Sequence, residues 1–389
     1  MRIDWIKGDK VIWMLAILLS VLSLLTVYSS TGSLAWLQRG GDTEYYLIKQ
    51  FMVVVFGLAI MYIAYLIPFR YYSRIGQFLF YISIPLLLAT LVYAPEINQA
   101  SRYLEFDVPL AGTLSFQTSD LAKLALIMFL ARFLSKKQDE IKSFKHGFIR
   151  IIIPVIIVCA LILPANLSTA AMLFAVSMIL LFIGKASLKH LGLLVLTGVA
   201  VFGILWGINK YNPEVLPRVN TWMSRLESFV DKDKEPSYQV VQSKIAVATG
   251  GLTGKMPGNS TQRNFLPHSY SDFVYAIIIE EYGLIGGTVI MLMFMILLFR
   301  SMKIARKCNV LFGSYLVTGI SFLMVFQALI NMGVAVSILP VTGQTLPFIS
   351  MGGTSFWFSC LGLGMILSVS KSVVEPETEK PKNMSYATA

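Results

Sequence analysis

Apolar residues occur along this chain in long unbroken blocks, and short polar segments separate the blocks. A helix needs about 20 apolar residues to cross the hydrocarbon core of a bilayer. This window predicts ten spans, at 11–30, 47–67, 75–93, 117–134, 149–164, 168–184, 190–208, 273–299, 310–332 and 346–370. The pattern therefore predicts an all-α polytopic membrane protein with ten transmembrane helices.

The fifth and sixth spans are predicted as separate helices because an unbroken helix over 149–184 would be too long for one crossing. Pro164, Asn166 and Ser168 supply the break. One ten-helix membrane domain, 1–372, is expected to contain a large extracytoplasmic loop at 209–272. The polar, Pro-rich tail over 373–389 is expected to be a disordered cytoplasmic segment.

Composition agrees with a membrane protein, since 56% of the residues are hydrophobic, 14% are charged and the mean hydropathy is +0.69. Soluble domains carry about a quarter charged residues. A net charge of +11 could suggest a nucleic-acid partner, but the basic residues lie in short connectors between apolar blocks. That distribution fits the positive-inside rule better than a phosphate-binding face, so no nucleic-acid partner is expected. The three cysteines lie in or beside apolar segments, so no disulfide framework is expected.

The distribution of Lys and Arg predicts the orientation. Ten spans place both termini on one side, and the short connectors of the other side carry only Arg39, Lys49 and Arg102. The positive-inside rule therefore predicts that both termini are cytoplasmic. The first apolar block lacks a small-residue cleavage site and is read as a retained span. The 209–272 loop then faces outside, and Asp272 lies at the outer surface where the eighth span begins.

Two interpretations of Asp272 are open. At the start of a membrane helix an Asp can be an N-cap that accepts hydrogen bonds from free N–H groups. A carboxylate at the interface can also be a general base for a substrate hydroxyl. Glu280 and Glu281 lie two to three turns deeper, where ionisable groups face a cavity or a partner. A structural pairing with basic residues of a neighbouring span and a substrate role are both open for them.

Asp120 and Lys123 lie three residues apart on one helix face of the fourth span. They are either an internal ion pair or a lysine directed at a phosphate with Asp120 orienting it. Arg102, Arg218 and Arg225 are outer cations that a negatively charged lipid headgroup would attract.

The glycines between 250 and 258 do not form a nucleotide-binding loop. Thr249 stands where the first glycine of a P-loop belongs, and Met256 follows Lys255 where Ser or Thr is required. The alternative that this loop approaches an extended sugar–lipid substrate is left open. The three histidines are too scattered for a metal site. His268, four residues from Asp272, is a candidate neighbour of the acid.

The segment 339–357, LPVTGQTLPFISMGGTSFW, contains two prolines and three glycines at the mouth of the last span. Irregular backbone at membrane depth is tolerated only where protein buries it or where it lines a cavity. We expect a re-entrant wall that faces Asp272.

Several motifs resemble those of the SEDS family, the group that includes RodA, FtsW and SpoVE. They are Gln239, Gln242 and Ser243, the GGLTGK glycines, LPHSYSDF running into EEYGLIGG, and LPVTGQTLPFISMGGTS. The resemblance covers roughly 11–372, and the TGQTLP and SMGGTS wording is closer to FtsW, the division member, than to RodA, the elongation member.

The resemblance implies a peptidoglycan glycosyltransferase that polymerises lipid II, without a nucleotide, on the outer face of the bacterial cytoplasmic (inner) membrane. It also implies a class B penicillin-binding protein and other division proteins as partners. It implies Asp272 as the essential acid. The expected substrate-binding residues are Lys123, Asp120, Arg102, Arg218, Gln239, Gln242, Ser243, His268 and Glu280. The departing pyrophosphate would be stabilised by these cations or by a divalent cation, Mg²⁺ or Mn²⁺.

The chain departs from the family pattern at positions around the expected site. Thr118 stands for a family proline and Asp120 for a glutamate, His268 and Tyr270 stand where Glu and His are common, and Asn166 and Ser168 stand where Asp and Gly are usual. Three alternatives stay open. One is a RodA-like polymerase that serves elongation rather than division. A lipid II flippase or transporter would depend on charges inside the spans. A non-catalytic division scaffold would not need Asp272.

Overall fold

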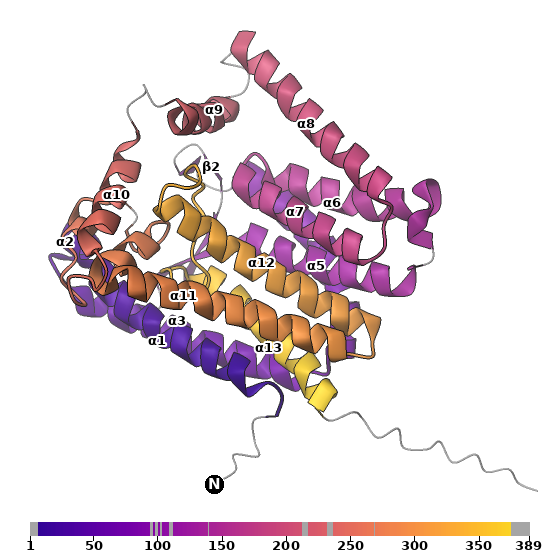
Figure 1. Ribbon diagram of the computed structural model, residues 1–389, viewed down its shortest axis with the longest axis horizontal. Coiled ribbons are helices and arrows are strands. Elements are labelled where there is room, and N and C mark those ends of the chain that lie inside the picture. The colour runs from indigo at the N-terminus through magenta and orange to yellow at the C-terminus, as the bar shows by residue number, and fades with distance from the viewer. Residues whose placement is uncertain are drawn as a thin grey trace, which may run out of the picture.

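The computed structural model describes residues 7–93, 96–97, 100–101, 103–108, 112–138, 140–211, 217–231, 236–267 and 269–374. Thirteen α-helices lie within these residues (Figure 1): α1 (Lys10–Ser30), α2 (Gly32–Arg39), α3 (Thr43–Leu66), α4 (Phe69–Tyr93), α5 (Thr118–Lys136), α6 (Ile149–Ile162), α7 (Leu167–Ile183), α8 (Leu188–Tyr211), α9 (Pro217–Val230), α10 (Tyr238–Gly250), α11 (Val274–Lys307), α12 (Leu311–Ala335) and α13 (Gly353–Val374).

Each of the ten predicted spans contains one of these helices. Six of them, α1, α3, α4, α11, α12 and α13, are long and apolar enough to cross a membrane, and α6, α7 and the first part of α8 are shorter apolar helices. The fourth predicted span corresponds to α5, which carries four charged residues in its 19. The chain is a multi-pass membrane protein of helical architecture, and the count of ten crossings stays a prediction.

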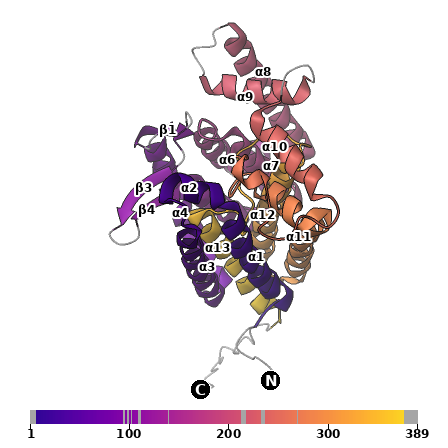
Figure 2. The same ribbon diagram turned by 90° about the vertical axis from the view of Figure 1, so that its left-hand side faces the viewer.

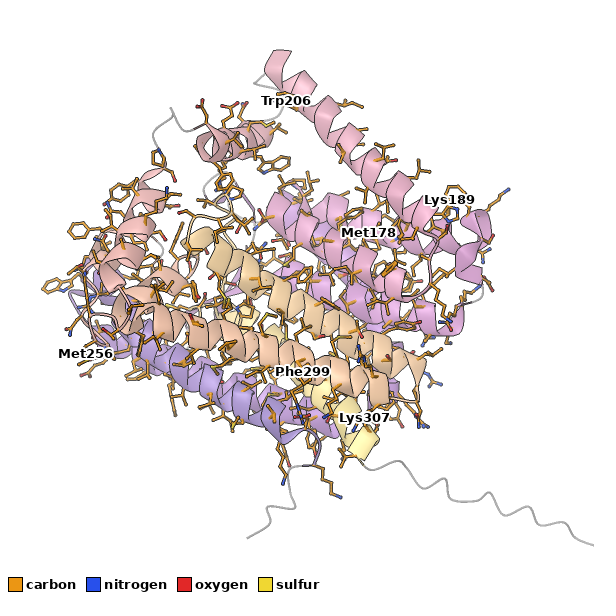
Figure 3. All side chains as sticks on the ribbon, in the orientation of Figure 1. Met178, Lys189, Trp206, Met256, Phe299 and Lys307 are labelled. Carbon is orange, nitrogen blue, oxygen red and sulfur yellow. The ribbon has the colours of Figure 1, made fainter. Side chains whose placement is uncertain are left out.

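The helices form a bundle whose centre is α12 and α5. Leu316, Val317, Ile320 and Val325 of α12 are fully buried, as are Leu126 and Ile127 of α5 among others. Long apolar side chains on the outer helices are instead exposed, such as Phe56 of α3 and Phe299 of α11 (Figure 3). An apolar belt of this kind is stable only against lipid.

The start of α1 and the end of α13 lie at the same end of the bundle (Figure 2), as an even number of crossings requires. The opposite end carries α2, α9 and α10 and the strands. Lys307 lies at the first end and Met256 at the second (Figure 3).

Two antiparallel hairpins precede α5. The first pairs β1 (Glu96–Ile97) with β2 (Ala100–Ser101), and the second pairs β3 (Tyr103–Val108) with β4 (Gly112–Gln117). In the second hairpin the Cα partners include Tyr103 with Gln117 and Val108 with Gly112. Single turns of other helix types occur at Glu140–Lys142, Phe144–Phe148 and Gln262–Asn264.

The 209–272 connector is not simply a loop. It contains α9 and α10, which the count of apolar blocks could not predict because both are shorter than a span. α9 is anchored by Val219 and Met223, which are buried, whereas its other face is open. Figure 1 shows α9 across the end of the bundle.

The predicted eighth span is not one regular helix. α11 is interrupted at Gly283, whose φ of 70° and ψ of −176° are not helical. The interruption divides α11 into a short outer part, 274–282, and a long inner part. This break determines how the glycine-rich loop before it is bound, as described below.

Candidate active site

Asp272 lies just before α11 and does not cap it. The helix begins at Val274 and its N-cap position is Phe273, which makes no side-chain cap hydrogen bond. The Asp272 carboxylate instead accepts a hydrogen bond from the Ser271 hydroxyl at 3.2 Å. The N-cap interpretation is therefore wrong. The N-cap position is one residue after Asp272, so the carboxylate is not placed at the free N–H groups of the first helical turn. The carboxylate is half-buried.

The backbone around Asp272 is held by the irregular segment after α12. Asn331 of α12 donates through Nδ2 to the Asp272 carbonyl at 2.8 Å and to the Gln344 carbonyl at 2.7 Å. Ser350 donates its hydroxyl to the Ser271 carbonyl at 2.7 Å. Two hydrogen bonds, to the Asp272 and Ser271 carbonyls, thus fix the main chain at the acid while its side chain stays half-buried.

The same segment is the wall that the prolines and glycines predicted. Residues 340–352 contain no helix, and the Met351 N–H donates to the Tyr270 carbonyl at 2.9 Å. Ser350 also accepts from the Leu346 N–H, which closes a tight turn. We call residues 340–352 the re-entrant wall. It is directly bonded to 270–272, so it faces the acid as expected.

Tyr270 is the aromatic neighbour of the acid. Burial raises the pKa of its phenol, and the negative charge of Asp272 and the nearby Tyr46 raise it further. The phenol therefore stays protonated at neutral pH and can act only as a neutral hydrogen-bonding group beside the carboxylate.

Asp120 and Lys123 form the predicted ion pair. The Lys123 Nζ atom lies 2.7 Å from the Asp120 carboxylate, and the two side chains are 7% and 5% exposed. Lys123 also donates to the Gln327 Oε1 atom at 3.2 Å. The second carboxylate oxygen of Asp120 is enclosed and has no hydrogen-bond partner within the described part of the chain. The pair borders a small cavity of about 30 Å³, so its lysine is paired and still adjoins open space.

Gln327 links this pair to the re-entrant wall. Its Nε2 atom donates to the Thr345 carbonyl at 3.0 Å while its Oε1 atom accepts from Lys123. Gln327 and Asn331 lie four residues apart on α12 and therefore on one face of the helix. They bind the wall at Thr345 and Gln344, on the Lys123 side and the Asp272 side respectively.

The Glu280 carboxylate has a structural role. It is fully buried and accepts from Lys255 Nζ at 2.7 Å, from Thr261 Oγ1 at 2.9 Å, and from the Thr261 and Gln262 N–H groups at 3.2 Å. Ser260 Oγ donates to it as well. These contacts leave little capacity for a substrate. The expected basic partner is present but comes from the loop after α10 rather than from a neighbouring span.

Glu281 holds the same loop from the other side of the helix. It is buried and accepts from the Ser29 hydroxyl at the end of α1 and from the Gly258 and Ser260 N–H groups. The two glutamates point in different directions, as their adjacency on a helix requires. They nevertheless share one function, because each binds a part of residues 255–263.

The glycine-rich loop packs on the break in α11. The Lys255 and Met256 N–H groups donate to the Glu280 and Glu281 carbonyls at 2.9 and 3.0 Å, and the Leu284 N–H donates to the Gly251 carbonyl at 2.9 Å. We call this pairing the glycine clamp, formed by residues 250–256 and 279–285. The glycines allow the two backbone segments to approach closely, and this packing accounts for the glycines without a bound substrate.

The remaining expected residues lie in different surroundings. Ser243 is buried and donates to the Ala335 carbonyl at 2.6 Å, so it satisfies the end of α12 instead of lining a site. On α10, Gln239 and Gln242 are both half-buried. Arg218 falls on α9. Arg102 and His268 lie outside the described residues.

Asn331, Gln327, Gln344 and Ser350 organise the site and were missed by the sequence reasoning. A signal for two of them existed, because amides at 327 and 331 interrupt the apolar run FLMVFQALINMG at helical spacing. Polar groups at such depth need a partner. Gln344 donates to Thr169 of α7 at 2.6 Å, a contact between residues 175 positions apart that no local pattern announces.

A resident metal site is not formed by the described residues, which hold no group of three or more His, Cys, Asp and Glu side chains that could bind an ion. Among the described residues, neither Asp272 nor Asp120 belongs to such a group. A divalent cation would therefore have to gain most of its ligands from a bound substrate.

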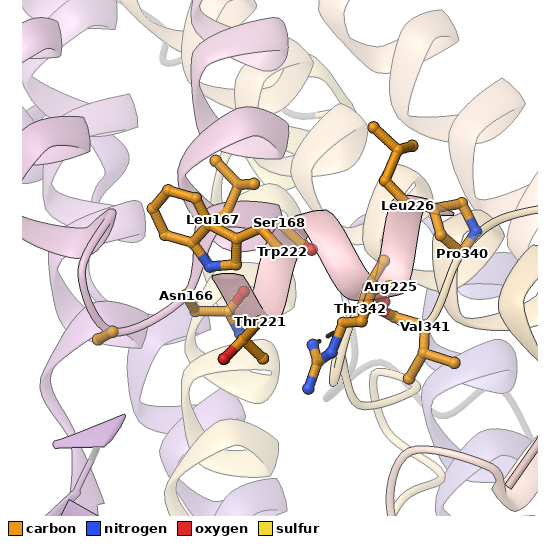
Figure 4. Close-up of a pocket in the computed structure, with 11 residues that line it drawn as sticks. Asn166, Leu167, Ser168, Thr221, Trp222, Arg225, Leu226, Pro340, Val341 and Thr342 are labelled. Carbon is orange, nitrogen blue, oxygen red and sulfur yellow. Dashed lines mark hydrogen bonds between the residues drawn. The ribbon is translucent and has the colours of Figure 1, made fainter. Parts of the chain in front are cut away.

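Two clefts open at the end of the bundle that carries α2 and α9. The larger, about 710 Å³, lies between the end of α1, α2 and residues 258–264. The second, about 160 Å³, lies between the α6–α7 turn, α9 and the start of the re-entrant wall (Figure 4).

Comparison with known proteins agrees with this architecture. Residues 9–375 match the FtsW/RodA/SpoVE family of cell cycle proteins. The chain is 31% identical over 366 residues to stage V sporulation protein E of Bacillus subtilis, covering 93% of this chain and 97% of that protein. It is 32% identical over 372 residues to the probable peptidoglycan glycosyltransferase FtsW of Geobacter metallireducens, covering 94% and 95%.

Solved structures show the same fold. One is a chain of a peptidoglycan synthase complex that coordinates polymerization and crosslinking, with a TM-score of 0.75, 24% identity, and coverage of 95% of this chain and all of that chain. Another is the rod shape determining protein RodA of Thermus thermophilus, with a TM-score of 0.67, 22% identity, and coverage of 95% and 98%.

Proposed function

The chain belongs to the FtsW/RodA/SpoVE family of cell cycle proteins, and on that basis we propose that it is a peptidoglycan glycosyltransferase that polymerises lipid II. The reaction takes place on the outer face of the cytoplasmic membrane, with both termini in the cytoplasm, and serves septal synthesis in cell division. A class B penicillin-binding protein and other division proteins are the proposed partners. The names of the FtsW relatives and the synthase complex with the same fold support this assignment.

The observation that carries the mechanism is the contrast among four carboxylates. Glu280 and Glu281 are buried and bound by loop residues, and Asp120 is buried and paired with Lys123. Asp272 alone of these four is half exposed, with a neighbouring serine on its carboxylate and a main chain held in place. A base needs this combination of fixed position and access.

In the proposed reaction Asp272 removes the proton from the sugar 4-hydroxyl of the incoming lipid II. The oxygen forms a bond to the anomeric carbon of the donor, and the bond from that carbon to the pyrophosphate breaks. The electron pair leaves with the undecaprenyl pyrophosphate, so no acid is needed to protonate the leaving group. Direct displacement inverts the anomeric centre and turns an α-linked donor into a β-linked product.

Cations stabilise the leaving group in this proposal. Lys123, Arg102 and Arg218 are the candidates. The Asp120 carboxylate offsets the positive charge of Lys123. Because Lys123 adjoins a cavity, however, the N–H group that it donates to Gln327 can be redirected to a phosphate oxygen. A divalent cation, Mg²⁺ or Mn²⁺, would be bound with the pyrophosphate, and no step above depends on it.

The test is polymerisation of labelled lipid II by the purified protein with its penicillin-binding partner, comparing the wild type with Asp272→Asn. The change keeps side-chain size and removes the base, so the rate should fall by roughly 10²–10⁴-fold. Asp42→Asn is the matched control, because Asp42 caps α3 through a hydrogen bond to the Tyr45 N–H, and Asn retains capping.

Normal polymerisation by Asp272→Asn would refute the role of the acid. A wild-type complex that forms no strands but moves lipid II across vesicles would favour the transporter, which the buried charges of α5 also suit. Repeating the wild-type assay with a chelator and with added Mg²⁺ or Mn²⁺ tests the cation.

A further inference from the structure

The cleft beside α9 has a lining that the reaction at Asp272 does not use. Three segments form it, namely residues 165–168 of the α6–α7 turn, residues 221–226 of α9, and residues 340–342 of the re-entrant wall. In Figure 4 the indole of Trp222 lies beside Asn166 and Leu167, and Arg225 extends toward Val341. Val219 and Met223 are buried and hold α9 in this place, so the cleft is a built feature of the fold.

The cleft offers an aromatic face together with neutral polar groups. Trp222 is half-buried, and Asn166, Thr221, Ser168 and Thr342 line the same space. Asn166 uses its Oδ1 atom to cap α7 through the Thr169 N–H at 3.1 Å, which leaves the two donors of its Nδ2 atom for another partner. An aromatic wall with a few convergent polar groups is the general pattern of a small-molecule site.

Thr342 gives an independent indication of a ligand. Its hydroxyl oxygen is enclosed, and no group in the described part of the chain forms a hydrogen bond with it. Buried polar groups in proteins are normally satisfied. At the edge of a cleft, a bound molecule or a water can supply the hydrogen bond that this hydroxyl lacks.

The charge of the lining excludes several ligand classes. Within the described part of the chain, Arg225 is the single charged residue of the lining, and its Nη1 atom donates to the Val341 carbonyl at 3.4 Å. A phosphate would require more cationic donors. A lipid tail would leave the polar groups unpaired. The lining suits a neutral ring that has an apolar face and polar substituents on its edge, as an N-acetylated amino sugar has.

The cleft and the acid lie on one continuous structure. Thr342 precedes Gln344 by two residues, and Asn331 bonds the Gln344 carbonyl and the Asp272 carbonyl through the same Nδ2 atom. Gln344 in turn donates to Thr169, one turn into α7 from the cleft. A chain of sugars that starts at Asp272 would meet the cleft along the wall.

We propose that this cleft is a subsite for the glycan strand, in which Trp222 stacks on an N-acetylated, β-1,4-linked amino sugar while Asn166, Thr221 and Thr342 bind its polar edge. The proposal rests on the proposed function, because the strand is the product of the reaction at Asp272. Holding a sugar unit here keeps the strand bound between additions, so the subsite increases product length.

The experiment measures direct binding of a fluorescently labelled tetramer of β-1,4-linked N-acetylglucosamine to the full-length protein in nanodiscs, by fluorescence anisotropy. Trp222→Ala should weaken binding by about tenfold or more, which corresponds to about 1.4 kcal/mol. Trp222→Phe should retain most of the affinity because it keeps an aromatic face. Trp36→Ala is the matched control, since Trp36 lies on α2, outside this cleft, and is 75% exposed.

Thr342→Val provides a second variant that preserves shape and removes the hydroxyl, and it should weaken binding several-fold even if Trp222→Ala does not fold. Absence of saturable binding to the wild type, or equal binding by the wild type, Trp222→Ala and Thr342→Val, would overturn the proposal. The binding assay needs no turnover. A protein that binds the tetramer through Trp222 but forms no strands would therefore refute the polymerase and leave the sugar site standing. With an active protein, Trp222→Ala should shorten the strands.

Discussion

Replacing Gly254 with Ala tests whether the glycine clamp holds the outer part of α11. A Cβ atom at Gly254 would lie 2.1 Å from the Glu281 carbonyl oxygen, which is backbone and cannot rotate away. Gly254 also has a φ of +81°. Gly258 has the same φ, but a Cβ atom there would meet nothing within 4 Å. The pair therefore separates the two costs, since both positions carry the backbone strain and only Gly254 carries the collision.

The magnitude follows from these contacts. An Ala in the left-handed region costs about 1–2 kcal/mol, and this should be the whole effect of Gly258→Ala. At Gly254 the loop must also move away from α11, which disrupts the Lys255 and Met256 hydrogen bonds of 2.9 and 3.0 Å. At roughly 1 kcal/mol each, these bonds add about 2 kcal/mol. Gly254→Ala should therefore destabilise the clamp by about 3–4 kcal/mol in total.

The assay is hydrogen exchange of the amides of residues 250–262 in the full-length protein, with the thermal inactivation midpoint as a second readout. Exchange should accelerate by roughly 30-fold more in Gly254→Ala than in Gly258→Ala, the factor that about 2 kcal/mol corresponds to. Equal acceleration in the two variants would refute the reasoning, because it would mean that the close backbone approach contributes nothing.

Two further variants test the polar contacts inside and at the edge of the bundle. Gln327→Leu should lower the free energy of unfolding by about 1–3 kcal/mol and slow polymerisation, because Lys123 loses an acceptor and the wall loses a donor. An unchanged thermal midpoint and rate would contradict the proposed connection of Lys123 to the wall through Gln327. Asp9→Asn should lower the free energy of unfolding by about 1 kcal/mol or less, because Asn still caps α1. It should also abolish the salt dependence of the thermal midpoint that arises from the 2.6 Å pair with Arg300. A salt response equal to that of the wild type would contradict a contribution from this ion pair.

The sequence predicted where the membrane helices lie but not how the segments between them fold. Apolar blocks are a local property, so each predicted span contains a helix. The helices α9 and α10 are too short and too mixed to stand out, and the break at Gly283 lies inside an apolar run. Family motifs and a crossing from polar to apolar sequence directed attention to Asp272, and the structure then showed that it is not a cap.

The candidate site shows a similar division. The Asp120–Lys123 pair could be predicted from its spacing of three, because neighbours on a helix face meet whatever the rest of the chain does. The roles of Glu280 and Ser243 could not, because their partners are Lys255, residues 260–262 and the Ala335 carbonyl, which the folded chain alone brings near. A motif identifies a residue as required without saying whether it binds substrate or backbone.

By itself the sequence determined that the chain is a membrane protein of apolar helices and that its basic residues concentrate in alternate connectors, since each depends on the free energy of placing local segments in lipid or water. The outer position of Asp272 stays a prediction. The tertiary structure alone decided that Asn331 holds Asp272 against the re-entrant wall, that two glutamates close the glycine clamp, and that Trp222 meets Asn166 across a cleft. These contacts join residues far apart in the chain, and they form because buried polar groups must find partners wherever packing brings them together.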